Sequence, residues 1–237
     1  MIMSTIDLNL QAIRHTIVAS EHEFARSGDS VTLLAVSKTF GPEAVLEAVA
    51  AGQTAFGENY LQEALDKIAA VAIALPDTAL EWHFIGPIQS NKTRAIAEHF
   101  DWVHTIERDK VARRLAEQRP AELAPLNVCL QVNISGEASK SGVAPAELPA
   151  LAKVVAGLPG LRLRGLMAIP EPSSDLAQQR AAFHQVRLLY EQLRADGVPL
   201  DTLSMGMSGD LRAAIAEGAT MVRIGSAIFG ARHYPAP

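Results

Sequence analysis

The sequence predicts a (β/α)8 TIM barrel, an α/β fold formed by a single domain with an extra N-terminal helix. Eight short apolar runs rich in β-branched residues alternate with helical patterns, which is typical of a parallel sheet buried on both faces. The length of 237 residues agrees with the ~250 residues that are typical of such barrels. No G-x-G-x-x-G or Walker sequence follows the first run, which disfavours the alternative of an open, doubly wound sheet.

The elements follow one another in the order that this barrel requires. A helix at residues 6–26 is expected before the first strand. Pro42 and Gly52 bound the next helical pattern at the usual start and stop positions. Strands are expected at residues 31–37, 54–57, 80–86, 102–107, 127–133, 163–169, 202–207 and 221–225. Further helices are expected at residues 42–52, 108–118, 145–156, 173–195 and 208–217, so that residues 1–237 form one domain.

Composition and charge exclude several classes of protein. The formal net charge of −5 argues against a broad surface for nucleic acid or membranes. No apolar run approaches the ~20 residues of a membrane span, and the first residues lack the pattern of a signal peptide. The single cysteine, Cys129, excludes a disulfide framework, and the seven histidines lack metal-ligand spacing. We therefore expect a cytoplasmic protein without a metal site.

Two basic residues near strand ends are the first candidates, because the active sites of such barrels lie at the carboxyl ends of the strands. Lys38 follows the first strand on the same face as Leu34 and Val36. If that face points inward, Lys38 lies over the barrel mouth, where a desolvated lysine acts as a base or forms a Schiff base. The alternative is a solvated lysine at a strand end. Arg223 lies within the eighth strand and needs an acceptor, either a ligand or a neighbouring carboxylate.

The loops after the seventh and eighth strands form a candidate phosphate site, since barrels often bind phosphate there on backbone N–H groups. Ser208 follows the seventh strand, and Gly225 and Ser226 follow the eighth. A glycine there allows the backbone to approach a ligand closely. Ser208 is alternatively the N-cap of a helix that begins near Leu211. The carboxylate of Asp210 argues against an anion site unless it points away.

Three residues and one loop are weaker candidates. Asn59 follows the second strand and could bond a ligand or cap a helix. His83 in the third strand is either a site residue or a core histidine, and Met167 in the sixth strand is expected to pack beneath the site. The polar loop at residues 135–142, which contains Lys140, is a candidate lid.

A lysine after strand one, a phosphate loop after strand seven and Arg-Ile-Gly-Ser at the end of strand eight resemble the fold-type III pyridoxal-phosphate proteins. More closely, the sequence resembles the short, single-domain pyridoxal phosphate homeostasis proteins of the YggS/PROSC family, built on one barrel like the N-terminal domain of alanine racemase. The matching segments are residues 35–38, 56–60, 82–86, 91–92, 132–142, 165–167, 204–208 and 223–225. The likeness therefore covers nearly the whole chain.

This resemblance implies a cofactor and the residues that hold it. Lys38 would carry pyridoxal 5′-phosphate (PLP) as a Schiff base, and Arg223 would face the pyridine nitrogen. Because a guanidinium stays protonated and can only donate, that nitrogen would remain unprotonated, which makes the cofactor a poorer electron sink. No residue has an implied catalytic role. The other implied cofactor-binding residues are Asn59 and Met167 around the ring, Ser208, Gly225 and Ser226 at the phosphate, and His83.

The expected function is intracellular PLP homeostasis, namely storage, buffering and delivery of the cofactor, without robust catalysis. Racemases with a similar barrel use a second domain and a partner subunit for proton transfer, and only residues 229–237 follow the eighth strand here. The expected partners are PLP, related B6 vitamers and PLP-dependent apoenzymes, and the expected state is a monomer. The alternatives are a PLP-dependent amino-acid racemase or decarboxylase of fold type III, and a cofactor-free barrel enzyme that acts on a phosphorylated sugar.

Overall fold

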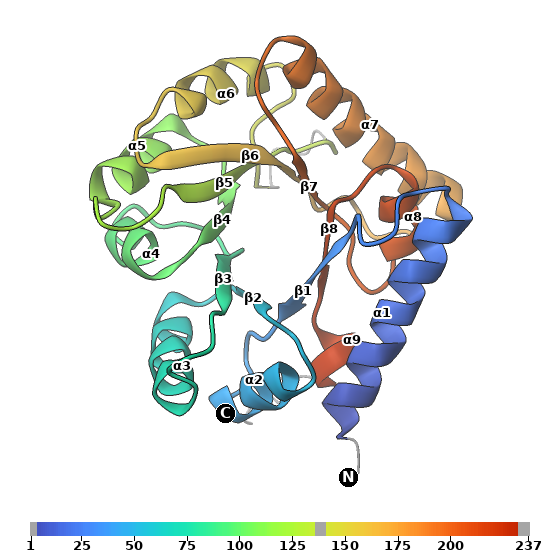
Figure 1. Cartoon of the computed structure of the whole chain (residues 1–237). Coiled ribbons are helices and arrows are strands. Elements are labelled where there is room, and N and C mark those ends of the chain that lie inside the picture. The colour runs from blue at the N-terminus through green and yellow to red at the C-terminus, as the bar shows by residue number, and fades with distance from the viewer. Residues whose placement is uncertain (1–3, 136–140, 232–237) are drawn as a thin grey trace, which may run out of the picture.

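A closed barrel of parallel strands forms the centre of the computed structural model, which describes residues 4–135 and 141–231. Each strand pairs with the next one in the sequence, and the last pairs with the first (Figure 1). The strands are β1 (Thr32–Val36), β2 (Ala55–Glu58), β3 (Glu81–Phe84), β4 (Trp102–Ile106), β5 (Leu126–Gln131), β6 (Leu161–Met167), β7 (Thr202–Ser204) and β8 (Met221–Ile224). The predicted fold class and all eight predicted strands are confirmed, with small shifts at the strand ends.

The helices lie outside the ring of strands (Figure 1). They are α1 (Thr5–Glu23), α2 (Pro42–Ala50), α3 (Leu61–Ala74), α4 (Thr93–His99), α5 (Asp109–Gln118), α6 (Leu148–Ala156), α7 (Leu176–Ala195), α8 (Leu211–Ala216) and α9 (Ser226–Phe229). The predicted set lacks α3, α4 and α9. Helix α3 begins after Tyr60 with no side-chain cap, but so do the predicted helices α2, α5 and α8, so a missing cap does not distinguish it. Within the described ranges no helix is long and apolar enough to cross a membrane.

Alternation along the strands separates the side chains that face the helices from those inside the barrel. Leu33 and Ala35 of β1 belong to the large apolar cluster that includes Val45 of α2. Two smaller clusters fill parts of the interior, Leu34 with Ala55 and Met221, and Trp102 with Cys129 and Met167. The strands also bring buried polar side chains into the barrel, among them His83, His104, Ser204 and Arg223.

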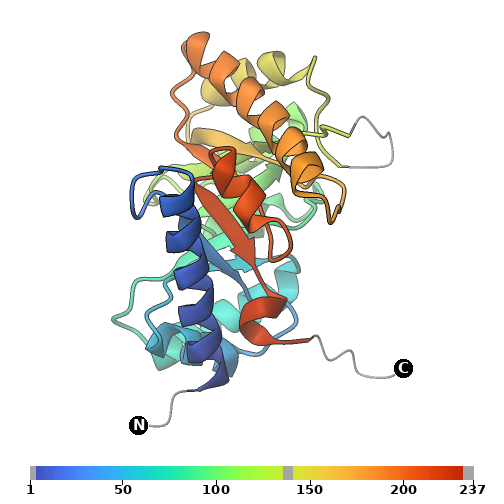
Figure 2. The same ribbon diagram turned by 90° about the vertical axis from the view of Figure 1, so that its right-hand side faces the viewer.

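Helix α1 joins the beginning of the described chain to its end. It packs alongside α2, α8 and α9 (Figure 2). Asn9 Nδ2 donates a hydrogen bond of 2.8 Å to the carbonyl oxygen of Ile228, and the ring of Phe229 lies 5.3 Å from the ring of Phe40, in the loop after β1. The segment that follows β8 is therefore fixed from both sides.

Candidate functional site

A cavity of about 270 Å³ opens at the carboxyl ends of the strands. Residues from the ends of β1, β2, β3, β6, β7 and β8 reach it, as expected for the functional face of a (β/α)8 barrel. Its lining consists of Val36, Lys38, Phe40, Asn59, Ile85, Ile169, Met207, Ser208, Gly209, Arg223, Gly225, Ser226 and Gly230. The structure thus brings together most of the residues singled out in the sequence, namely Lys38, Asn59, Ser208, Arg223, Gly225 and Ser226.

The backbone on either side of Lys38 is held from behind by α3. Lys67 Nζ donates to the carbonyl oxygen of Ser37 at 2.8 Å, and Thr39 N donates to Glu63 Oε1 at 2.6 Å. Thr39 has a φ of 69°, a left-handed conformation that a β-branched residue rarely adopts. Strain of this kind persists where the surroundings impose it. The side chain of Lys38 therefore leaves a backbone whose direction is fixed on both sides.

A buried ion pair supports the same strand end. Lys67 Nζ lies 2.6 Å from Glu58 Oε1, and both side chains are almost fully buried. Ser37 Oγ donates to the same carboxylate oxygen at 2.6 Å. Burial raises the pKa of Glu58, and Lys67 opposes that shift. The pair ties β1, β2 and α3 together directly behind Lys38.

The loop after β7 has the features of an anion site. Within the described chain, the backbone N–H groups of Ser208 and Gly209 have no hydrogen-bond acceptor. Asp210 turns its carboxylate back onto the chain, where Oδ1 accepts from Met207 N at 2.6 Å. Asp210, not Ser208, is the N-cap residue of α8. The carboxylate of Asp210 therefore argues less strongly against an anion site than the sequence alone suggests. Ser208 does not cap the helix, and it lines the cavity.

Gly225 and Ser226 approach the same cavity from β8. A Cβ atom at Gly225 would lie 3.3 Å from the carbonyl oxygen of Val36, which is closer than an ordinary van der Waals contact. The absence of a side chain lets the β8 loop approach the end of β1 beside Lys38.

Arg223 supplies a buried positive charge at the floor of the cavity. Its side chain donates to Ser204 Oγ at 2.9 Å and to the carbonyl oxygen of Ala168 at 3.1 Å. Both acceptors are neutral, and no described carboxylate forms an ion pair with this guanidinium. Burial lowers the pKa of Arg223 to about 10, although Asp210 opposes that shift. A buried cation without an anionic partner favours an electron-rich ligand in the cavity.

Two residues that the resemblance implied at the cofactor do not line the cavity. His83 is fully buried inside the barrel, between Glu81 and His104, and Met167 packs with Trp102 and Cys129. Both point into the barrel, one layer below the residues that do line it, so His83 is a core histidine and Met167 packs beneath the site. The residues that do line the cavity there are Ile85 and Ile169, which lie two positions after His83 and Met167 in the sequence.

A second cavity of about 190 Å³ adjoins the first and shares Asn59, Ile85 and Ile169 with it. Asn59 Oδ1 is buried and has no hydrogen-bond partner within the described ranges. A buried amide oxygen that has no hydrogen-bond partner and lies between two cavities indicates a side chain that can bind a ligand there. Asn59 does not cap α3, since that position belongs to Tyr60.

Several neighbours of the site carried no clear sequence signal. The spacing of Glu63 and Lys67 suits an i,i+4 pair on a helix, but nothing local indicates that Lys67 is buried against β1. The predicted lid with Lys140 falls largely on residues 136–140, which lie outside the described residues. No group of three or more His, Cys, Asp or Glu residues in the described ranges is arranged to hold a metal ion.

Comparisons with known proteins show similar sequences over nearly the whole chain. Residues 8–233 match the family described as "Alanine racemase, N-terminal domain". The chain is 62% identical over 235 residues to the "Pyridoxal phosphate homeostasis protein" of Pseudomonas aeruginosa, with 99% of each chain covered. The corresponding protein of Escherichia coli K12 is 56% identical over 232 residues, covering 98% of this chain and 99% of that one.

A solved structure extends the likeness to a ligand. PipY of Synechococcus elongatus, determined with PLP bound, superimposes with a TM-score of 0.81 at 37% sequence identity. The alignment covers 95% of this chain and 100% of PipY. The relative with bound PLP therefore shares the architecture over its whole length.

Proposed function

This chain belongs to the family of pyridoxal phosphate homeostasis proteins, within the larger family of alanine racemase N-terminal domains, and we propose that it binds PLP through Lys38 to keep the free cofactor buffered. One observation carries the proposal. The amine of Lys38, the unpaired guanidinium of Arg223 and the N–H groups after β7 all converge on one cavity. PLP presents an aldehyde, a pyridine nitrogen and a phosphate, and each of these has a suitable group here.

The chemistry of the cavity residues also fits the individual functional groups of the cofactor. The N–H groups of Ser208 and Gly209, with Ser226 opposite them, would hold the phosphate. Arg223 would donate to the pyridine nitrogen, and Asn59 would bond a polar substituent of the ring through its orphaned amide oxygen. Ile85 and Ile169 would cover the faces of the ring and exclude water.

When bound, PLP supplies an aldehyde that reacts reversibly with primary amines. Lys38 provides such an amine at the end of a fixed strand, so attachment is reversible and another amine can compete for the cofactor. Arg223 keeps its proton and leaves the ring nitrogen unprotonated. These residues retain the cofactor and do little to promote bond cleavage in a bound amino acid, so we propose a store that delivers PLP to cytoplasmic apoenzymes.

Absorbance spectroscopy and reduction test the proposal directly. Purified protein mixed with PLP should show a visible band, and borohydride should fix the cofactor to the peptide that contains Lys38, as read by mass spectrometry. Lys38→Ala should abolish both signals, whereas Lys110→Ala, at an exposed position of α5, should retain them. Unchanged loading of Lys38→Ala would refute the role of this lysine. Rapid exchange of α-protons from an amino acid in deuterated solvent would instead favour a racemase.

A further inference from the structure

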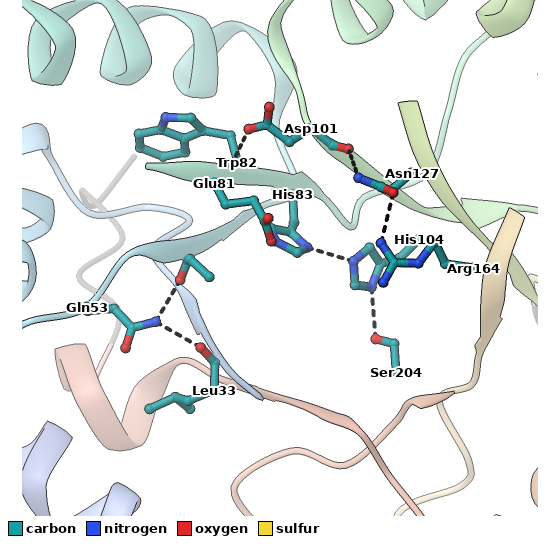
Figure 3. Close-up of polar contacts among 11 residues, drawn as sticks. Leu33, Gln53, Glu81, Trp82, His83, Asp101, His104, Asn127, Arg164 and Ser204 are labelled. Carbon is teal, nitrogen blue, oxygen red and sulfur yellow. Dashed lines mark hydrogen bonds and ion pairs between the residues drawn. The ribbon is translucent and has the colours of Figure 1, made fainter. Parts of the chain in front are cut away.

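A continuous hydrogen-bond chain crosses the interior of the barrel below the cavity, and Figure 3 shows its part from His83 through His104 to Ser204. Glu81 Oε1 lies 2.7 Å from His83 Nε2, and His83 Nδ1 lies 2.9 Å from His104 Nε2. His104 Nδ1 lies 2.8 Å from Ser204 Oγ, which accepts from Arg223 at 2.9 Å. The chain thus links four strands, from β3 through β4 and β7 to β8, and connects one face of the barrel with the other.

The two ends of the chain differ in charge and in exposure. Glu81 begins β3 at the amino-terminal face, where 47% of its side chain is exposed. Arg223 is almost fully buried at the floor of the cavity, and His83, His104 and Ser204 are fully buried between them. An anionic group that solvent can reach is therefore joined through three neutral, dry side chains to the cation beneath the site.

The direction of every hydrogen bond in the chain follows from the donors available. An ionised carboxylate only accepts, so His83 carries its proton on Nε2 and donates to Glu81. With both imidazoles neutral, His83 Nδ1 then accepts from His104 Nε2, and His104 Nδ1 accepts from the hydroxyl group of Ser204. Ser204 Oγ in turn accepts from Arg223, whose guanidinium only donates. All the bonds run from the cation to the carboxylate, with both imidazoles neutral.

Burial supports the neutral form of both histidines. It lowers the pKa of His83 against the opposing pull of Glu81, and it lowers the pKa of His104 further because His83 and Arg223 lie beside it. The hydrogen bond from His83 lowers the pKa of Glu81, so this carboxyl group remains the negative end. Other ionisable groups that influence the chain are Asp101 and Arg164 near Glu81, and Asp210 and Cys129 near Arg223.

We propose that Glu81, His83, His104 and Ser204 are positioning residues for Arg223, which they hold against the ring-nitrogen end of the bound cofactor and couple to the carboxylate on the opposite face. The proposal rests on the function proposed above, since it takes Arg223 as the group that meets the pyridine nitrogen. Hydrogen bonds in a dry chain polarise one another, so the negative charge of Glu81 strengthens each acceptor up to Ser204. The guanidinium therefore keeps one orientation and its remaining N–H groups face the cavity.

Removing one link tests the positioning role. Ser204→Ala breaks the chain beside Arg223, and we expect an affinity for PLP lower by about tenfold, the effect of losing one hydrogen bond to a charged group. The visible band of the bound cofactor should also shift, because Arg223 is free to turn from the ring. Ser204→Thr keeps the hydroxyl group and should restore both the affinity and the band. Thermal unfolding of each variant reports whether the barrel itself remains intact.

Removing the negative charge of Glu81 distinguishes electrostatic coupling to Arg223 from a role in packing alone. Glu81→Gln keeps an oxygen that accepts from His83 but removes the negative charge, so the visible band of bound PLP should shift while the fold is retained. Glu98→Gln, on the surface helix α4, is the matched control and should behave as the wild type. A purely structural role for Glu81 would leave the band of Glu81→Gln where it is in the wild type.

The histidine rings provide a readout that needs no cofactor. Nitrogen-15 NMR of histidine-labelled protein should show both buried rings neutral and protonated on Nε2, before and after PLP is added. If the wild type binds PLP through Lys38 but Ser204→Ala and Glu81→Gln match it in affinity and spectrum, the positioning proposal is overturned and the proposed function stands. If the wild type takes up no PLP, the positioning proposal and the proposed function both fail. Neutral histidine rings in the NMR spectrum would then indicate a hydrogen-bond chain with a structural role alone.

Discussion

Lys67 Nζ donates a hydrogen bond of 2.8 Å to the carbonyl oxygen of Ser37, the residue that precedes Lys38 in the sequence. A buried lysine on α3 thereby supports, through the backbone, the lysine that points into the cavity. The same ammonium group neutralises Glu58 at 2.6 Å. The backbone from which Lys38 extends is therefore held by a helix that does not itself line the cavity.

Lys67→Met should destabilise the fold by about 3–5 kcal/mol, because it leaves the carboxylate of Glu58 buried without its partner. Chemical denaturation measures the loss as a lower midpoint. Lys110→Met, at an exposed position of α5, is the control and should change stability little. A variant with wild-type stability would mean that Glu58 is readily accommodated as a neutral acid.

Ser208→Ala keeps the backbone N–H group but removes a hydroxyl group that would bond the phosphate beside it, so the affinity for PLP should fall by about tenfold, the effect expected on losing one charge-assisted hydrogen bond. The affinity for pyridoxal, which has no phosphate, should remain at its wild-type value. Titrations of both ligands followed by absorbance measure the two affinities. An equal loss for both ligands would place Ser208 away from the phosphate.

Gly86→Ala should disturb the site through the backbone of Asn59. A Cβ atom at Gly86 would lie 2.1 Å from the carbonyl oxygen of Asn59, so that segment must move. We expect a loss of about 1–3 kcal/mol of stability, as for other overpacked sites, together with weaker binding of PLP. Gly28→Ala meets no atom within 4 Å and serves as the control, and thermal unfolding with a PLP titration measures both effects.

Stability should fall as the pH decreases below about 6.5, the ordinary pKa of a histidine. Burial lowers the pKa of His83 and of His104 in the folded state, so only the unfolded chain takes up protons there. The loss continues down to the folded pKa values and amounts to about 1.4 kcal/mol per pH unit for each histidine.

His104→Gln should reduce the change in stability per pH unit by the contribution of one histidine. His99→Gln, at an exposed position of α4, should leave that slope unchanged. Urea denaturation between pH 5 and 8 measures both variants in a range above the ordinary pKa of carboxylic acids. An unchanged slope in His104→Gln would show that this ring is protonated in the folded protein as well.

The sequence allowed the barrel and the face of the site to be predicted, because both follow from local patterns. Alternating strand and helix signals define the topology, and the carboxyl ends of the strands direct attention to Lys38 and Ser208. The depth of a side chain in the barrel was harder to assign. His83 and Met167 lie on the correct strands and point inward, but one layer too low, because strand periodicity defines the face of a residue and not its height.

Partners that lie far apart in the sequence could not be predicted. The chain from Glu81 to Arg223 joins four strands, and its bond between His104 and Ser204 spans 100 residues. Helix α3 was not among the predicted helices, and the role of Lys67 was therefore missed with it. Such contacts depend on tertiary packing, which no local pattern records.

The packing of α1 against α9 has a consequence for synthesis of the chain on the ribosome. Asn9 and Ile228, 219 residues apart, are hydrogen-bonded, and β1 pairs with β8 to close the barrel. A nascent chain that has not yet reached β8 lacks Arg223, Gly225 and Ser226 and cannot close its first strand. The cavity is therefore completed only after β8 has been synthesised, and a ligand that fills it would bind only to a molecule whose barrel has closed.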